Sequence, residues 1–203
     1  MPKHRALAVL AATALASCGT DGTQPSGVIA TGGPQLSLSD PPIEVSILQR
    51  STPLLHNFVA TSTIGPEGGT IRLPDAGFSI TFPANAVASP TSITVAAVPG
   101  YAVAYLFHPH GLVFAQPAVA TQDLRSTRAP RTTSGLRQME GAYFPGLESL
   151  LGLVATVSET RPALVDADAR KMTWTVEHFS GYAVSTRRSG YLNSSGNLIP
   201  VGR

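Results

Sequence analysis

Short runs of alternating apolar and polar residues, each closed by turn residues, are the feature that most constrains this chain. Three such runs cover residues 78–82, 93–97 and 172–176, and every second residue in each run is apolar. They are bounded by turn residues such as Gly68-Gly69 and Pro99-Gly100. A period of two places the apolar side chains on one face of a β-strand. Short strands at this spacing predict an all-β fold, an antiparallel β-sandwich or barrel.

Charge is sparse along the chain and argues against nucleic acid as a partner. Only 13% of the 203 residues are charged, and the formal net charge is +2. Lys3 and Arg5 account for that surplus, so the rest of the chain is neutral. Binding a phosphate backbone requires an excess of positive charge.

The first 17 residues have the pattern of a secretory signal peptide. A short basic start precedes the apolar stretch Ala6–Ala16, which as a helix would span about 16 Å, too little for a bilayer core of about 30 Å. The stretch ends Leu15-Ala-Ser-Cys18, and Cys18 is the single cysteine of the chain. Small residues followed directly by cysteine resemble a bacterial lipoprotein signal. The alternative is an ordinary signal peptide with an incidental cysteine.

A lipoprotein signal implies a membrane anchor at Cys18. The thiol would receive a diacylglycerol, the chain would be cut before the cysteine, and the new amine would take a further acyl chain of the palmitate type. Several acyl chains anchor a protein stably, whereas a single chain binds marginally. The expected location is therefore the bacterial cell envelope. Gly19, rather than aspartate, after the cysteine favours the outer membrane if the host has two membranes.

The remaining chain divides by composition into a tether, a body and a tail. Residues 18–57 are rich in Gly, Pro, Ser and Thr and predict a flexible tether, because such a stretch buries too little apolar surface to offset its ordering entropy. A short strand at 43–48 could belong to the body or stand alone. The body covers 58–186. Residues 187–203 are a polar tail whose end could add an edge strand, although disorder is the expectation.

Several segments of the body together resemble a ZU-five domain, the β-sandwich module of zonula occludens and Unc-five proteins. They are Ile64-Gly-Pro-Glu-Gly-Gly-Thr-Ile71, Phe78-Ser-Ile-Thr-Phe-Pro-Ala-Asn-Ala-Val87, Ile93-Thr-Val95, His108-Pro-His-Gly-Leu-Val-Phe114 and Pro117-Ala-Val119. The chain departs from the family at Pro83-Ala-Asn-Ala-Val87, where a second proline and a glycine are frequent. Residues 121–167 do not align. The resemblance is to the versions found in bacterial lipoproteins, and it implies a β-sandwich.

The resemblance also points to His178-Phe179-Ser180, because some ZU-five proteins cut themselves between Phe and Ser of such a sequence. The Ser180 hydroxyl would attack the Phe179 carbonyl, with His178 as general base, and water would hydrolyse the resulting ester. The alternative interpretation is structural. His178 would be a half-buried residue on the same strand face as Trp174, and Gly181-Tyr182 would form a bulge that redirects the final strand.

Other candidate sites have simpler interpretations as turns and loops. His108 and His110 could share a metal, but no carboxylate or cysteine lies close upstream, so a turn is favoured and no metal or other cofactor is expected. Asp166-Ala-Asp168 lacks the ligand run of a calcium loop and predicts a hairpin turn. The segment 124–137 contains four arginines, at 125, 128, 131 and 137, and predicts a solvated loop or, secondarily, an anion-binding patch.

These observations favour a lipid-anchored, extracytoplasmic module that binds a protein or serves as a structural component of the envelope. No nucleophile elbow, phosphate loop or dinucleotide fingerprint is present, so activity on an external substrate is not expected. The first alternative is a self-cleaving module. The second is a glycan-binding module that would need exposed tyrosines, with Tyr101, Tyr105, Tyr143 and Tyr191 as candidates.

Overall fold

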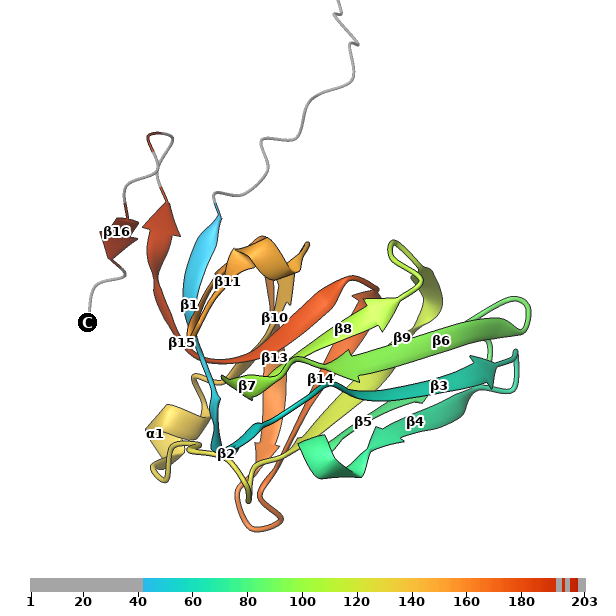
Figure 1. Ribbon diagram of the computed structural model, residues 1–203, viewed down its shortest axis with the longest axis horizontal. Helices are drawn as coiled ribbons and strands as arrows, with labels where there is room; N and C mark the ends of the chain where they lie inside the picture. The colour runs from blue at the N-terminus through green and yellow to red at the C-terminus, as the bar shows by residue number, and fades with distance from the viewer. Residues whose placement is uncertain (1–41, 193–194, 196–197, 201–203) are drawn as a thin grey trace, which may run out of the picture. The chain divides into compact units, whose positions relative to one another are not determined.

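Strands make up nearly all the regular structure in the residues that the computed structural model describes, which are 42–192, 195 and 198–200. In chain order the strands are β1 (Ile43–Ile47), β2 (Gln49–Leu54), β3 (Phe58–Ile64), β4 (Gly69–Leu73), β5 (Phe78–Phe82), β6 (Thr91–Ala97), β7 (Gly100–Ala102), β8 (Ala104–His108), β9 (Val113–Asp123), β10 (Glu140–Phe144), β11 (Leu150–Leu151), β12 (Val154–Val157), β13 (Glu159–Asp166), β14 (Lys171–His178), β15 (Gly181–Leu192) and β16 (Leu198–Pro200). Short helical turns are η1 (Pro74–Ala76), α1 (Thr133–Leu136) and η2 (Leu147–Ser149). The predicted all-β, antiparallel fold is confirmed (Figure 1).

Burial follows the alternation predicted from the sequence. In β5, Phe78, Ile80 and Phe82 are buried, while Thr81 between the last two is exposed. The turn that leads into β5 ends at Gly77, whose φ of 63° lies in the left-handed region that glycine adopts without strain. The apolar side chains of β5 thus face the interior, because the strand period of two and the preceding turn together set the register of the strand.

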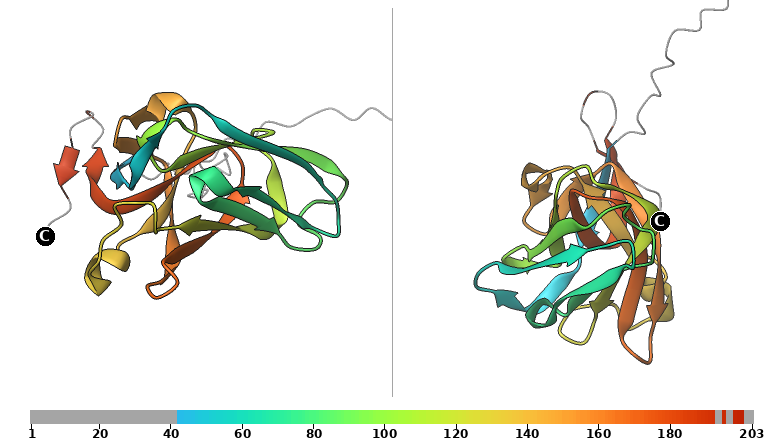
Figure 2. Two further views of the ribbon diagram at one scale, coloured as in Figure 1. Left: turned by 60° about the horizontal axis from the view of Figure 1, so that its bottom comes forward. Right: turned by 90° about the vertical axis from the view of Figure 1, so that its right-hand side faces the viewer.

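Ten antiparallel strands follow one another around the main interior. The order is β4-β5-β9-β14-β13-β10-β15-β8-β6-β3. The two ends of this series, β3 and β4, are joined by a tight turn with a bridge between Gly65 and Gly68. The sandwich is therefore nearly closed into a barrel, and the two views in Figure 2 show its strands wrapped around one interior.

Two strands change partners along their length and connect the sheets. The first half of β13 pairs with β10, and its second half, from Ala163, pairs with β14. β15 pairs with β10 and β8 near Tyr182, and its continuation from Ser185 pairs with β1. Because β1 also pairs with β12, the far half of β15 carries a small additional sheet, β11-β12-β1.

Strands β8, β10 and β15 are buried on both faces. In β8, Tyr105 and Phe107 face the main interior, whereas Ala104 belongs to a second apolar cluster on the other side. That second cluster is contributed by β1, β7, β8, β10, β12 and β15 and contains Ile43, Val45, Ile47, Ala102, Ala104, Ala142, Phe144, Ala155, Val157 and Ala183. Burial on both faces explains why residues 102–107 are uninterrupted apolar sequence rather than an alternating pattern.

The structure corrects two predicted boundaries. Residues 43–54, assigned to the tether, form β1 and β2; β1 is paired between β12 and β15, and its Val45 and Ile47 side chains are buried. The strand at 43–48 thus belongs to the body; tether residues 18–41 and Cys18 lie outside the described residues. Residues 187–192 are also strand, the end of β15, and Leu198–Pro200 pairs with it as β16 rather than being disordered. Hydrogen bonding to β1 is what orders this polar stretch.

Helices contribute little to the described residues, and none of them is both long and apolar enough to span a bilayer.

Candidate functional site

The predicted self-cleavage sequence lies where β14 passes into β15. Its backbone is fixed by neighbouring strands: the Phe179 amide donates to the Leu112 carbonyl at 2.9 Å, and the Gly111 amide donates to the Phe179 carbonyl at 2.9 Å. The Ser180 carbonyl accepts from the Phe107 amide, again at 2.9 Å. The segment is therefore bound on both sides as part of the sheet.

The Phe179 side chain holds this segment in the main core. It is fully buried, with its ring stacked on Phe107 at a centroid distance of 4.9 Å and edge-on to Phe114 at 4.8 Å. Aromatic pairs in these two geometries are favourable beyond the area that they bury. Phe179 thus acts as a packing residue whatever the chemistry of its carbonyl.

The Ser180 hydroxyl is held between two partners. It donates to the Phe179 carbonyl oxygen at 2.7 Å and accepts from the Tyr143 hydroxyl at 3.1 Å. Tyr143 reaches it because β10 and β15 are paired with Tyr143 opposite Tyr182. The carbonyl of the Phe179–Ser180 bond therefore receives two donors, the Gly111 amide and the Ser180 hydroxyl.

His178 contacts different neighbours. Its Nε2 lies 3.6 Å from Oε2 of Glu159, and its ring meets that of Tyr143 edge to face at 4.5 Å. Within the described residues no hydrogen bond joins His178 to Ser180. The side chain is 28% exposed, as the structural interpretation of a half-buried histidine expects.

The expected bulge at Gly181-Tyr182 is wrong. Gly181 pairs in regular register with Leu106 and Phe144, and the irregularity lies instead between Val176 and His178, where β14 pairs with β9. Gly181 is needed for space, because a Cβ there would lie 2.2 Å from the Phe144 ring.

A small charged cluster borders His178. Arg161 makes a two-pronged ion pair with Glu177, at 3.0 Å for each contact, and a further ion pair with Glu159. Tyr182 packs beneath this cluster, and burial, reinforced by the Glu159 carboxylate, raises the pKa of its hydroxyl above its ordinary value.

Two further sequence candidates form turns. The rings of His108 and His110 meet edge to face at 4.5 Å, and the described residues contain no group of three His, Cys, Asp or Glu that could hold a metal ion. In the β13–β14 turn, Oδ1 of Asp166 accepts from the Asp168 and Ala169 amides at 3.0 and 2.8 Å, which confirms the hairpin prediction.

The tyrosines proposed for glycan stacking do not share one surface. Tyr105 is fully buried in the main core, and Tyr143 is partly buried against it. Tyr101 is 45% exposed and lies beneath the Arg128 guanidinium, 5.8 Å from its carbon. The Tyr191 side chain lies outside the described part of the chain.

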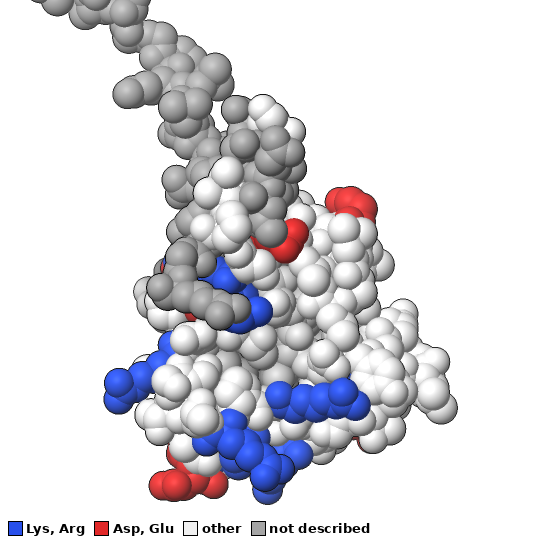
Figure 3. Space-filling model, turned by 90° about the vertical axis from the view of Figure 1, so that its left-hand side faces the viewer, with Lys and Arg blue, Asp and Glu red and all other residues white. Residues whose placement is uncertain are grey.

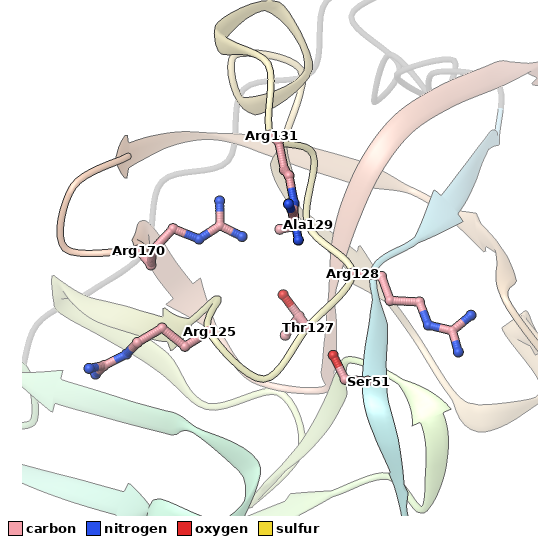
Figure 4. Close-up of a pocket in the computed structure, with 7 residues that line it drawn as sticks. All are labelled: Ser51, Arg125, Thr127, Arg128, Ala129, Arg131 and Arg170. Atoms are coloured by element: carbon pink, nitrogen blue, oxygen red, sulfur yellow. The ribbon is translucent and has the colours of Figure 1, made fainter.

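An arginine-lined hollow lies at the end of the molecule that carries the 124–137 loop. Figure 3 shows basic side chains gathered on the lower part of one face. The hollow has a volume of about 700 Å³ and is lined by Ser51, Arg125, Thr127, Arg128, Ala129, Arg131 and Arg170 (Figure 4). We call these residues the arginine hollow. The anion-binding patch that the sequence suggested as a second interpretation of this loop would lie at this hollow.

Backbone contacts fix the loop that forms the arginine hollow. The Arg128 amide donates to the Gln49 carbonyl and the Ser51 amide to the Ser126 carbonyl, at 2.8 and 2.9 Å. The Thr127 hydroxyl donates to the Leu124 carbonyl at 2.8 Å. The loop is therefore tied to β2 rather than freely solvated, although its arginine side chains are mostly exposed.

Sequence reasoning identified the loop but missed two of the seven residues that line the hollow. Arg137, one of the four arginines in the predicted loop, does not line the hollow, whereas Ser51 and Arg170 do. Both come from segments far from the loop in sequence, and only the pairing of β2 and β14 with their neighbours brings them there. Arg170 has a φ of 53°, in the left-handed region, and no local sequence pattern marked it as part of this site.

In comparisons with known proteins, neither a protein-family model nor a curated protein sequence matches the chain.

Proposed function

We propose that this chain is a lipid-anchored, extracytoplasmic module of the ZU-five type that binds a partner or supports the cell envelope, without catalysis on an external substrate. The observation that carries the proposal is the arginine hollow, a concave and positively charged surface assembled from three separate segments of a chain whose net charge is only +2. Loops at one end of a β-sandwich are a common place for binding surfaces.

The anchor in this proposal is Cys18. Its support is the sequence pattern alone, a basic start, an apolar stretch and small residues directly before the single cysteine. The residues between Cys18 and β1 would connect the lipid to the β-sandwich, which the described chain enters at β1. A membrane-tethered sandwich of this kind would present its loops to partners in the envelope.

The intact mass of the protein, extracted from membranes of its native host, tests the anchor. We expect one uncut species that begins at Cys18 and carries the mass of the acyl chains. Replacing Cys18 by serine is the control, and it should release an unacylated protein from the membrane fraction. An unacylated wild-type mass would contradict the proposed anchor and location.

Self-cleavage is the second candidate, and one contact favours it. The Ser180 hydroxyl lies 2.7 Å from the Phe179 carbonyl oxygen, which also accepts from the Gly111 amide. Attack of Oγ on the Phe179 carbonyl carbon would form an ester as the amide bond breaks, and the hydroxyl proton would pass to the Ser180 nitrogen. Water would then hydrolyse the ester to a Phe179 carboxylate and a free hydroxyl. The Gly111 amide would stabilise the intermediate oxyanion.

The same mass measurement separates the two candidates. A lipidated piece ending at Phe179 and a second piece beginning at Ser180 would make self-cleavage the central function. The Ser180→Ala variant should then remain intact, because it lacks the nucleophile, whereas Tyr143→Phe should still be cut. A fragment pair that persists in Ser180→Ala would exclude self-cleavage through Ser180.

A further inference from the structure

The arginine hollow carries positive charge that the described residues neutralise only at Arg125. Arg125 is paired with Asp123 at 2.6 Å, but none of the ion pairs among the described residues includes Arg128, Arg131 or Arg170. Asp166 and Asp168 lie in the same turn as Arg170. The Asp166 carboxylate is bonded to backbone amides of that turn, and neither aspartate lies within ion-pair distance of an arginine.

Two of the guanidinium groups converge. Figure 4 shows the Arg131 and Arg170 side chains extending toward each other above Thr127, while Arg125 and Arg128 point outward. The Arg128 guanidinium already has partners: it lies over the Tyr101 ring, and its Nη1 donates to the Gln49 side-chain oxygen at 3.3 Å. Arg170 makes one long contact, 3.4 Å to the Pro130 carbonyl. Like charges placed in this way repel each other, and an anion between them would remove the repulsion.

A buried cation next to the hollow adds to its positive potential. Arg50 precedes Ser51, and its backbone forms an antiparallel β-bridge with Thr127. Its side chain is buried, and the residue is 4% exposed. Its Nη1 donates to the Ala102 carbonyl, whereas Nε and Nη2 have no hydrogen-bond partner among the described residues. It lines a second cavity of about 350 Å³ that also includes Thr127, Asp75 and Asp123. Asp123 already pairs with Arg125, so the buried Arg50 guanidinium has no ion-pair partner in the part of the chain that the structure describes, and a nearby anion would offset its desolvation.

We infer that the arginine hollow binds a phosphate group through Arg131 and Arg170, with the Ser51 hydroxyl as a further donor; this inference rests on the binding function proposed above. Guanidinium forks approaching from two directions match a tetrahedral oxyanion with several free oxygens better than a single planar carboxylate. A phosphate carries a charge of about −1.5 to −2 at neutral pH, enough for two guanidinium groups. The hollow is open on its outer side, so the phosphate can be free or attached to a larger molecule.

A local site of this kind agrees with the neutral charge of the chain as a whole. A phosphate backbone needs an extended basic surface, whereas one phosphate group needs only the few donors gathered here. The predicted absence of a nucleic-acid partner therefore remains the expectation, and the ligand class is a monophosphate or a phosphate-bearing headgroup.

Titration with inorganic phosphate tests the inference on the chain from residue 19 onward. We expect saturable binding by calorimetry and a rise in Tm at constant ionic strength. The double variant Arg131→Gln/Arg170→Gln should weaken phosphate binding by at least about tenfold. Arg187→Gln removes an exposed arginine from β15, outside the hollow, and should bind phosphate as the wild type does. Equal phosphate binding by the double variant and the wild type would overturn the site.

Two further probes identify the source of the phosphate. Vesicles that contain phosphatidylglycerol, compared with vesicles of phosphatidylcholine, test a lipid headgroup. Binding to the anionic vesicles that is lost in the double variant would support the same site with a lipid ligand. Acetate at equal ionic strength tests a plain carboxylate, and a Tm rise equal to that with phosphate would overturn the assignment to phosphate.

The outcomes for this inference and for the proposed function are separable. Poly-glutamate that binds at the hollow while inorganic phosphate does not would overturn the phosphate ligand and leave a protein-binding module standing. An unacylated mass from native membranes would overturn the anchor and leave the phosphate titration unaffected, because that measurement does not involve the lipid.

Discussion

Strands β8, β10 and β15 separate two cores that are built from side chains of very different size. The main core is rich in aromatic residues, among them Phe107, Phe179 and Tyr182. The second core, on the opposite face of the same strands, is half alanine, with Ala104 and Ala183 among its members, and Phe144 is the one aromatic side chain among its described buried members. Within β15 the change occurs between neighbours, since Tyr182 faces one core and Ala183 faces the other.

The difference in side-chain size follows from what covers each face. The main core fills the interior of a nearly closed barrel, where opposing sheets stand about 10 Å apart and large rings are needed to fill the space. The second core lies under β1 and β12, a layer held to β15 by hydrogen bonds. Small side chains let such a layer approach closely. The two cores therefore differ in how they should respond to truncation and to enlargement.

Removal of β1 and β2 is the strongest test of whether the two cores are independent. A chain that starts at residue 58 loses the buried side chains Val45, Ile47 and Leu48. Each fully buried side chain of this kind contributes about 1.5–3 kcal/mol. Their sum is comparable with the total stability of a domain, about 5–15 kcal/mol. We expect this chain to lose cooperative unfolding and to bind a dye specific for exposed apolar surface.

A chain that starts at residue 39 is the matched control, because it keeps both strands. It should unfold in urea at the same midpoint as the chain from residue 19 onward. If the shorter chain from residue 58 also unfolded at that midpoint, the second core would be an accessory layer and the main core would be stable alone.

Phe107→Ala tests the aromatic core by creating a cavity. Phe107 is fully buried, and its ring contacts Phe179, Phe78 and Tyr182. Truncation of a buried phenylalanine to alanine costs about 3–5 kcal/mol. Urea denaturation should show this loss, whereas Leu164→Ala, at a position that is 80% exposed, should change the free energy of unfolding by less than about 0.5 kcal/mol.

The main core could be predicted from sequence because its strands alternate. Phe78, Ile80 and Phe82 show the period of two, and Gly77 marks the turn before them. The second core left no such signal. Strands buried on both faces lose their alternation, as in Ala102-Val-Ala-Tyr-Leu-Phe107, and β1 is preceded by a segment rich in Gly and Pro. For this reason β1 was assigned to the polar tether, and only its pairing with β12 and β15 shows that it belongs to the body.

The candidate site was accessible to sequence reasoning only where its residues are local. Arg125, Arg128 and Arg131 lie within one loop and could be seen as a group. Ser51 and Arg170 join them through strand pairing, which no local pattern encodes. The same holds for Tyr143, which reaches Ser180 because its strand is paired with β15.

Ala183→Leu tests the second core by overfilling it. Ala183 is fully buried opposite Ala142 and Ala104 in neighbouring strands. Extra methylene groups in a close-packed core force side chains and backbone to shift, at about 1–3 kcal/mol. We expect a loss in this range by urea denaturation. An unchanged or increased stability would mean that the alanine-lined core has room to spare, and the contrast between the two cores would be weaker than their composition suggests.

Two tyrosine substitutions should have the smallest effects on the free energy of unfolding. They compare a hydrogen-bonded and an unbonded hydroxyl within the main core, among the described residues. The Tyr105 hydroxyl donates to the Ala76 carbonyl at 3.1 Å and contacts Oε1 of Gln122 at 2.5 Å. The Tyr182 hydroxyl has no hydrogen-bond partner within the described chain. Tyr105→Phe should therefore cost about 1 kcal/mol at neutral pH, whereas Tyr182→Phe should be close to neutral.

The dependence of the free energy of unfolding on pH above neutrality gives a further test of these two tyrosines. Burial raises the pKa of both hydroxyls above the value of about 10 that tyrosine has in the unfolded chain. The fold favours the protonated forms, so their contribution is complete below pH about 10 and is lost as the pH rises above it. Each phenylalanine variant should flatten that loss in denaturation measurements between pH 8 and 11, although only Tyr105→Phe lowers stability at pH 7. The second core has no titratable residue among its described members, so a variant there, such as Ala183→Leu, should leave the slope of the alkaline limb unchanged. An altered slope in Ala183→Leu would show that the two cores are coupled through β15.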